Sequence, residues 1–225
     1  QKRSNPNTFT YPSMRNPIYW ATQGYVVLDR AEFPIVGEGD KEPNDSFRKQ
    51  LVANGKAAID AVDRMGFIDR ERVGVGGHSY GAFMVANLLS HSNLFAAGIA
   101  RSGAYNRTLT PFGFQSEERS YWEAPNVYYS MSPFMHADKM KTPLLLVHGE
   151  EDNNSGTYPL QSVRYFNALK GLGATARLIM LPKESHGYRA KESILHLIWE
   201  QDRWLEMHVK NKKKKLVKEK NKPKG

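Results

Sequence analysis

The stretch Arg72-Val-Gly-Val-Gly-Gly-His-Ser-Tyr-Gly-Ala-Phe-Met84 predicts a short buried strand, a sharp turn at Ser79 and a helix over residues 80–90. Within it, Gly77-His-Ser-Tyr-Gly81 matches G-x-S-x-G, in which a serine stands on a strained strand-to-helix turn with its oxygen exposed above a sheet. Both glycines are expected to supply the bare backbone that such a close crossing requires. We therefore interpret Ser79 as a nucleophile, with simple capping of the helix as the alternative.

The rest of the chain alternates strand and helix signals around this turn. Buried strands are predicted at 26–29, 96–100, 143–147 and 176–181, and helices at 18–23, 46–65 and 158–170, with a closing helix whose inward side holds Ile194, Leu197, Ile198 and Leu205. This alternation is typical of a mostly parallel sheet with helices on both faces, here the α/β-hydrolase fold. Active sites in such sheets lie beyond the carboxyl ends of the strands.

Two segments interrupt this pattern. Residues 103–133 are rich in aromatic side chains and show almost no periodicity, which predicts a long irregular loop with a functional role. Ser46 is expected to cap the helix that follows it, with Leu51, Ala58, Val62 and Met65 on one face.

Composition indicates one globular domain followed by a charged tail. The chain has 225 residues, 40% of them hydrophobic, and a formal charge of +9. Residues 209–225 hold nine Lys and one Glu, so this segment carries +8 and the remainder only +1. We expect a domain over 1–209 and a disordered Lys-rich tail over 210–225. The domain has almost no electrostatic basis for binding nucleic acid, although the tail could bind polyanions.

Other classes of protein are excluded by what the sequence lacks. The chain contains no cysteine, which excludes disulfides and thiolate metal sites and leaves the cellular compartment open. No apolar run approaches the ~18 residues that a membrane-spanning helix needs.

A hydrolase serine needs a histidine base and a carboxylate that orients the base, in the chain order Ser, acid, His for this fold. After the strand at 143–147, Gly149-Glu-Glu-Asp152 offers three carboxylates. After the last strand comes His186, which we interpret as the base, while capping of the last helix is its alternative role. His136 and His148 are less easily excluded as the base than the other histidines of the chain, although His148 still lies within its strand.

Four segments together resemble the prolyl oligopeptidase (S9) family of serine peptidases, and most of all its glutamyl endopeptidase branch. They are Gly-Gly-His-Ser79-Tyr-Gly-Ala-Phe-Met, Ala-Arg101-Ser-Gly-Ala-Tyr-Asn-Arg107-Thr-Leu-Thr-Pro-Phe-Gly-Phe, His148-Gly-Glu-Glu-Asp152-Asn-Asn and Glu184-Ser-His186-Gly-Tyr. The resemblance covers nearly all of residues 15–209. It implies that Ser79 is the nucleophile, Asp152 the acid and His186 the base.

In that mechanism, His186 takes the proton of Ser79 as it attacks an acyl carbon, and the backbone N–H of Tyr80 donates to the oxyanion. No metal or cofactor is required. The family also implies an N-terminal β-propeller that restricts access to peptides and small proteins. The propeller and the early strands of the sheet are absent from this sequence, and we expect the chain to be an N-terminally truncated catalytic domain.

The glutamyl branch implies a preference for an acidic residue before the scissile bond. A buried carboxylate needs a cation, and a guanidinium binds it bidentately better than a lysine would. Arg101, at the end of a strand, and Arg107, in the aromatic loop, are the two candidates, unless Arg101 only pairs with Glu117 or Glu118. The alternatives to an endopeptidase are an esterase or exopeptidase with the same catalytic residues, and a non-catalytic interaction fragment.

Overall fold

The computed structural model describes residues 12–15 and 17–212. Its centre is a sheet of four parallel strands in the order β1-β2-β3-β4. These are β1 (Gly74–His78), β2 (Ala97–Arg101), β3 (Leu144–Gly149) and β4 (Ala176–Leu181). The α-helices are α1 (Pro17–Thr22), α2 (Phe47–Asp63), α3 (Tyr80–His91), α4 (Pro125–Met131), α5 (Leu160–Gly171) and α6 (Lys191–Leu205). The shorter elements are η1 (Pro43–Ser46), η2 (Arg70–Arg72), η3 (Arg107–Leu109), η4 (Pro133–Lys139) and the π-helical η5 (Glu206–Lys210).

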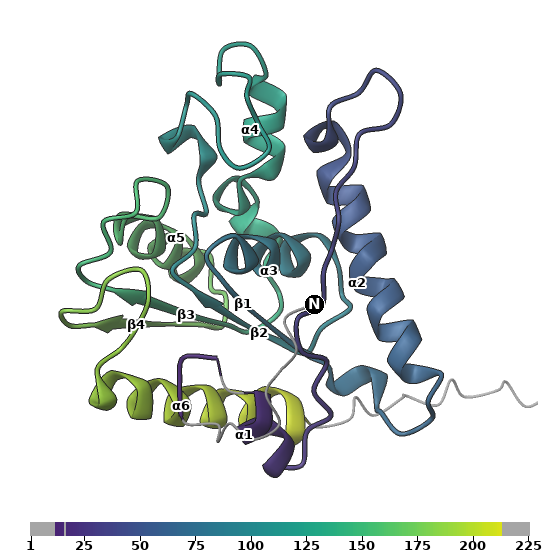
Figure 1. Ribbon diagram of the computed structural model, residues 1–225, viewed down its shortest axis with the longest axis vertical. Coiled ribbons are helices and arrows are strands. Elements are labelled where there is room, and N and C mark those ends of the chain that lie inside the picture. Colours follow the sequence, from purple (N-terminus) through teal and green to yellow (C-terminus); the bar gives the residue numbers. More distant parts are fainter. Residues whose placement is uncertain (1–11, 16, 213–225) are drawn as a thin grey trace, which may run out of the picture.

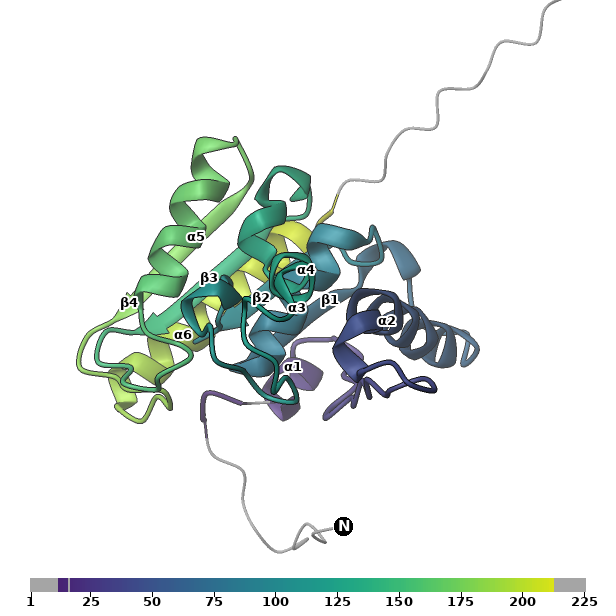
Figure 2. The same ribbon diagram turned by 90° about the horizontal axis from the view of Figure 1, so that it is seen from above.

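Helices cover both faces of the sheet, which confirms the predicted fold class. Figure 1 shows α6 and α1 on one face and α2, α3 and α5 on the other. Seen from above, α5, α3 and α2 lie in a row across the sheet (Figure 2). Because all four strands run parallel, their carboxyl ends meet at one edge of the sheet, where the loops that follow them come together.

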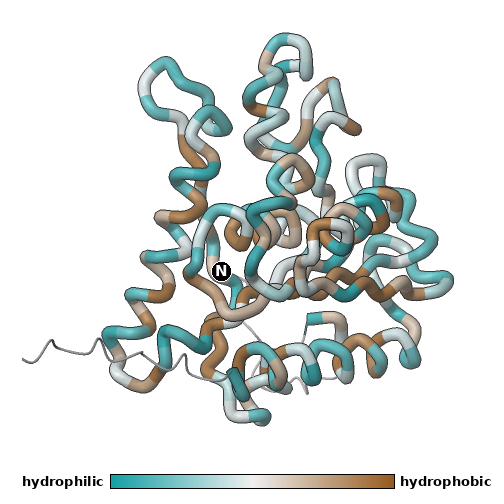
Figure 3. The backbone as a smooth tube through the Cα atoms, turned by 180° about the vertical axis from the view of Figure 1, so that it is seen from behind, coloured by the Kyte–Doolittle hydropathy of each residue, from teal (hydrophilic) through white to brown (hydrophobic). Residues whose placement is uncertain are grey.

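Strand β3 shows why its sequence is an uninterrupted apolar run. Leu144 and Leu146 belong to the core beneath α2, α3 and α5, whereas Leu145 and Val147 belong to the core on the α6 side. Successive side chains of a strand point to opposite faces, so a strand covered on both faces is apolar at every position. Figure 3 shows hydrophobic, brown residues along the strands in the middle of the trace.

The strand expected at residues 26–29 is not present. This segment has no regular secondary structure, and Val26 and Leu28 are each 54% exposed. An apolar run becomes a strand only where a neighbouring strand supplies hydrogen-bond partners for its backbone. Among the described residues, β1 has β2 as its only partner and nothing pairs with residues 26–29.

Helix α2 packs through a face that shares only Leu51 with the predicted one. Ser46 stands at its N-cap position without bonding a backbone N–H, and its hydroxyl accepts from Gln50 Nε2 at 2.6 Å. Met65 lies beyond the end of the helix and is 64% exposed. The buried positions follow steps of four residues and are Phe47, Leu51, Gly55 and Ile59. The prediction missed this face because one of its members is a glycine, which carries no hydrophobic signal. A Cβ at Gly55 would lie 3.1 Å from Leu88 Cδ2, so the glycine brings α2 close to α3.

The aromatic segment 103–133 is more regular than predicted. It contains η3 and α4, and α4 buries Val127, Tyr128 and Met131 against the core. A seven-residue helix spans about two turns, too few for a periodic pattern to be seen in the sequence. In Figure 1 this segment rises beyond α3, on the side of the sheet away from α6.

The C-terminal tail lies mostly outside the described residues. Lys210 donates to the Gln23 carbonyl at 3.2 Å and Lys212 to the Glu71 carbonyl at 2.9 Å, so the first tail residues contact the domain. The disorder of residues 213–225 remains a prediction. No helix in the described part of the chain combines the length and the hydrophobicity that crossing a membrane requires.

Candidate active site

Ser79 occupies a strained turn between β1 and α3. Its φ of 57° and ψ of −118° lie in a region that residues other than glycine rarely adopt. Hydrogen bonds on both sides hold this conformation: Ser79 N donates to the Arg101 carbonyl at 2.8 Å, and Phe83 N donates to the Ser79 carbonyl at 3.2 Å. The turn places the serine oxygen above the carboxyl edge of the sheet.

Of the two glycines in the motif, only Gly77 is required by close packing. A Cβ at Gly77 would lie 2.2 Å from the carbonyl carbon and oxygen of Gly81, a distance that no packing allows. A Cβ at Gly81 would meet no atom within 4 Å. The prediction that both glycines allow the crossing is therefore correct for Gly77 and wrong for Gly81.

This difference predicts opposite outcomes for two alanine substitutions. Gly77→Ala must push β1 and α3 apart and should lower the thermal midpoint by roughly 6–12 °C, equivalent to about 3 kcal/mol. Gly81→Ala, in the first turn of α3, should leave the midpoint unchanged or raise it, because alanine favours helix. Calorimetry of both variants provides the measurement. Equal midpoints for the two would refute the assignment of the close contact to Gly77.

The structure brings Ser79, Asp152 and His186 together, although each follows a different strand. His186 Nε2 lies 2.9 Å from Ser79 Oγ, and His186 Nδ1 lies 2.8 Å from Asp152 Oδ2. Because Nδ1 faces a carboxylate, it carries the ring proton, and Nε2 is free to accept the hydroxyl hydrogen of the serine. Glu150 and Glu151, the other carboxylates of the motif, are exposed.

Asp152 is fully enclosed by hydrogen-bond donors. Its side chain is inaccessible to solvent. Oδ1 accepts from Asn154 N at 3.0 Å, and Oδ2 accepts from the Thr157 hydroxyl at 3.3 Å in addition to His186. A further donor is His148 Nε2, 3.0 Å from Oδ2. The sequence did not predict the hydrogen bond from Thr157 to Asp152, because a single threonine in a loop belongs to no motif.

The histidines that competed for the role of base occupy other places. The ring of His136 packs 4.7 Å from that of His91, on the side of the molecule near the end of α3. His148 contacts Asp152 rather than Ser79. His78, which precedes Ser79 in the sequence, places its ring 4.9 Å from the His186 ring. Burial, assisted by the nearby His186 and Arg101, lowers the pKa of His78 to about 3, so it packs against His186 as an uncharged ring.

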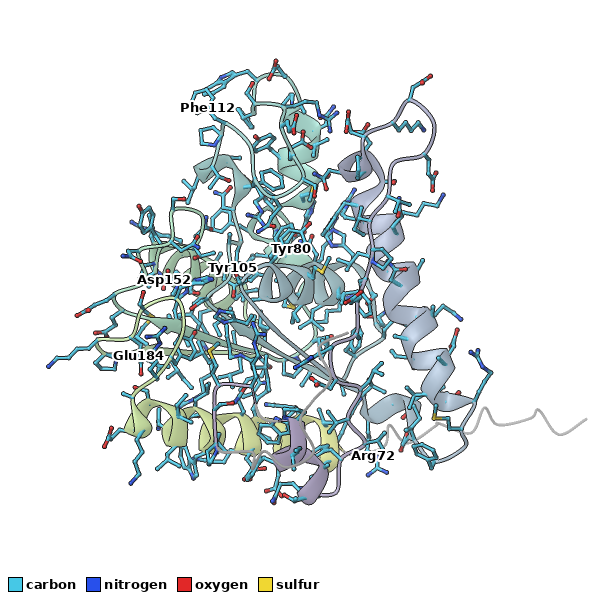
Figure 4. All side chains as sticks on the ribbon, in the orientation of Figure 1. Arg72, Tyr80, Tyr105, Phe112, Asp152 and Glu184 are labelled. Carbon is cyan, nitrogen blue, oxygen red and sulfur yellow. The ribbon has the colours of Figure 1, made fainter. Side chains whose placement is uncertain are left out.

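A cavity of about 220 Å³ opens beside the serine. Its lining residues come from the turn, the aromatic segment and the loop after Asp152, and they are Ser79, Tyr80, Ala104, Arg107, Thr110, Gly113, Phe114, Gln115, Asn154, Ser155, Gly156 and Thr157. Tyr80 begins α3, so its backbone N–H has no partner within the helix and can donate to an atom in the cavity. Figure 4 shows Tyr80 and Asp152 on the same side of the sheet.

Arg107 is the charged group in the lining of this cavity. Its guanidinium carbon lies 4.0 Å from the Phe83 ring centre and 4.5 Å from that of Phe114, which hold it by cation–π contacts. Burial lowers the pKa of Arg107 to about 10, still well above neutral pH, so the side chain is charged. Within the described part of the chain, no carboxylate forms an ion pair with it.

Arg101, the other candidate, does not line the cavity. It is partly buried and donates through Nη1 to Gln201 Oε1 of α6 at 2.6 Å. Its alternative partner Glu117 is occupied by Arg119, with bonds of 2.7 and 2.9 Å. Side-chain alternation explains the result: Ile99 faces α6, so Arg101, two residues further along β2, faces the same way. The sequence shows that Ile99 and Arg101 share one face of the strand, but that α6 covers this face is known only from the tertiary structure.

Comparison with known proteins places the chain in a family. The profile of the family described as "Prolyl oligopeptidase family" matches residues 41–212. The chain is 58% identical over 209 residues to a protein of Arabidopsis thaliana named "Probable glutamyl endopeptidase, chloroplastic", and 57% identical to one of the same name from Oryza sativa subsp. japonica. Each alignment covers 92% of this chain but 22% of the relative, so the chain spans about a fifth of the length of these proteins.

Solved structures share the fold. The acylaminoacyl peptidase of Pyrococcus horikoshii superposes with a TM-score of 0.59 and 28% identity, over 74% of this chain and 28% of that protein. A puromycin hydrolase gives a TM-score of 0.62 at 24% identity, over 70% of this chain and 25% of the other.

Proposed function

We propose, on the premise that this chain belongs to the prolyl oligopeptidase family of peptidases, that it hydrolyses peptide bonds through an acyl-enzyme formed on Ser79. The observation that carries the proposal is the continuous set of hydrogen bonds from Ser79 Oγ to His186 Nε2 at 2.9 Å and from His186 Nδ1 to Asp152 Oδ2 at 2.8 Å. A nucleophile, a base and a group that orients the base are the three parts this chemistry needs.

The reaction follows from these contacts. Ser79 Oγ attacks the carbonyl carbon of the substrate while its proton moves to His186 Nε2, and the oxyanion that forms accepts from the Tyr80 backbone N–H. His186 then gives the proton to the leaving amine as the C–N bond breaks, which leaves an ester on Ser79. Water attacks this ester with His186 again as base, the acid product departs, and the proton returns to Ser79. Asp152 stays ionised throughout and stabilises the imidazolium.

For the substrate, we propose a glutamate before the scissile bond, held by Arg107. The cavity beside Ser79 contains this guanidinium, buried to 4% exposure and without a carboxylate partner among the described residues. An unpaired buried cation favours an anionic ligand, since a carboxylate removes the unfavourable energy of leaving the charge uncompensated. The name of the Arabidopsis and rice relatives agrees with this choice.

Replacement of the two arginines by methionine tests the substrate assignment. Arg107→Met should lower kcat/KM for a peptide with Glu before the cleaved bond by about 10- to 100-fold relative to the same peptide with Gln, because one charge-assisted interaction is lost. Arg101→Met is the matched control and should keep the wild-type ratio of Glu to Gln cleavage. A Glu to Gln ratio unchanged in Arg107→Met would exclude Arg107 as the specificity residue.

The class of reaction is tested by labelling and by cleavage mapping. A fluorophosphonate probe should modify Ser79 and no residue in Ser79→Ala, and mass spectrometry of a digested peptide mixture should show new C-termini that end in Glu. Cleavage confined to chain ends or to small acyl esters would instead favour an exopeptidase or an esterase. Absence of labelling would indicate a non-catalytic fragment.

A further inference from the structure

His148 is a fully buried histidine that the proposed reaction does not use. It lies near the end of β3, four residues before Asp152, and its side chain has no accessible surface. Its ring sits against the same carboxylate that orients His186. A buried polar ring must have its hydrogen-bonding groups satisfied, and His148 satisfies both nitrogens.

The partners of His148 determine where its proton lies. Nε2 is 3.0 Å from Asp152 Oδ2 and 2.6 Å from the Thr157 carbonyl oxygen, and both of these are acceptors. Nε2 therefore carries the hydrogen. Nδ1 is 2.6 Å from Ser162 Oγ and accepts the hydroxyl hydrogen of that serine. Burial lowers the pKa of His148 against the opposing effect of Asp152, which agrees with a neutral ring holding one proton.

The hydrogen bonds of His148 help to hold the Asp152 carboxylate in one orientation. Ser162, in the first turn of α5, orients the His148 ring, and the Nε2–H of the ring is shared between Asp152 Oδ2 and the Thr157 carbonyl oxygen. Oδ2 is also the oxygen that accepts from His186. The Asn154 N–H holds the other oxygen, Oδ1. The carboxylate is therefore fixed from both sides, with Oδ2 facing the base.

We propose that His148 is a positioning residue for the reaction, whose Nε2–H, aimed by Ser162, holds the carboxylate of Asp152 so that Oδ2 faces His186. This rests on the proposed function, because it assigns His148 a part only if His186 and Asp152 act as base and acid. Catalytic groups depend on such supporting contacts, since small losses of alignment strongly reduce the rate.

Two amide substitutions distinguish the loss of the Nε2–H donor from a change in side-chain volume. In His148→Gln the amide nitrogen reaches the position of Nε2 and can donate to Asp152, whereas in His148→Asn the amide reaches only the position of Nδ1, beside Ser162. His148→Asn should lower kcat for a small activated ester by about 10- to 100-fold with KM unchanged. His148→Gln should recover most of that loss. Rates are divided by the number of active sites titrated with a fluorophosphonate, so that unfolded protein does not contribute.

The outcomes distinguish this inference from the proposed function. Wild-type rates per titrated site in both variants, even with lower thermal midpoints, would overturn the positioning role and leave the reaction itself intact. A wild-type protein that the fluorophosphonate does not label would overturn the proposed function first. If both amide variants fail to fold, Ser162→Ala removes only the oxygen that aims the ring, and it should lower kcat several-fold; an unchanged kcat would refute the role of His148.

Discussion

Replacing Ser79 by alanine is expected to lower the rate of peptide hydrolysis by about 10⁶-fold, because no acyl-enzyme can form without the serine oxygen. His186→Ala should have a loss of similar size, since the serine hydroxyl at 2.9 Å would lose the group that takes its proton. Both substitutions lie at a partly exposed turn or loop and should shift the thermal midpoint little. Pre-steady-state and steady-state kinetics on a Glu-containing peptide provide the measurement.

The double variant Ser79→Ala/His186→Ala tests whether the two side chains act as one unit. Residues that act as one unit are not additive, so the double variant should be about as slow as either single variant. A loss in the double variant equal to the product of the two single losses would mean that the side chains act separately. Retention of most activity in His186→Ala would point to another histidine as base.

Asp152→Asn is expected to lower kcat by about 10⁴-fold while the protein still folds. The asparagine amide would present N–H groups to His186, which favours the tautomer with its proton on Nε2, facing Ser79 where an acceptor is needed. The donors of Asn154, Thr157 and His148 that now converge on the carboxylate would lose part of their acceptor as well. Rapid-quench measurement of acylation gives the rate directly.

Glu151→Gln is the matched control for this substitution. Glu151 is a neighbouring carboxylate of the same motif, but its side chain is exposed. It should keep wild-type kcat, which would show that the loss in Asp152→Asn comes from the site and not from a change in net charge. Similar losses in the two variants would contradict the assignment of Asp152 as the acid.

Local patterns were sufficient to predict the turn at Ser79 and the strands that follow it. The strand, the turn and the helix are consecutive in sequence, so their local structure can be predicted from neighbouring residues. The order of Ser79, Asp152 and His186 along separate parallel strands made their convergence at one sheet edge predictable, because parallel strands end on the same side. The distances between these side chains came only from the structure.

Residues 26–29 show where local patterns are insufficient. The apolar run there is as good a strand signal as that of β3, yet β3 has a strand on each side to pair with its backbone, whereas no strand among the described residues pairs with residues 26–29. A strand is stabilised by partners distant in sequence, so its hydrophobic pattern predicts the ability to pair and not the pairing itself.

By itself, the sequence determined a parallel α/β sheet and the residue types of a serine hydrolase, since both depend on short-range periodicity and on a strained local turn. The tertiary structure alone decided which arginine lines the cavity. Arg101 and Arg107 are close in the chain, but β2 directs the first toward α6, whereas the following segment turns back over α3 and places the second beside Ser79. It also showed that His148 contacts Asp152 rather than Ser79, because the orientation of a buried ring is set by its partners, here Asp152 and Thr157 in the loop after β3 and Ser162 in α5.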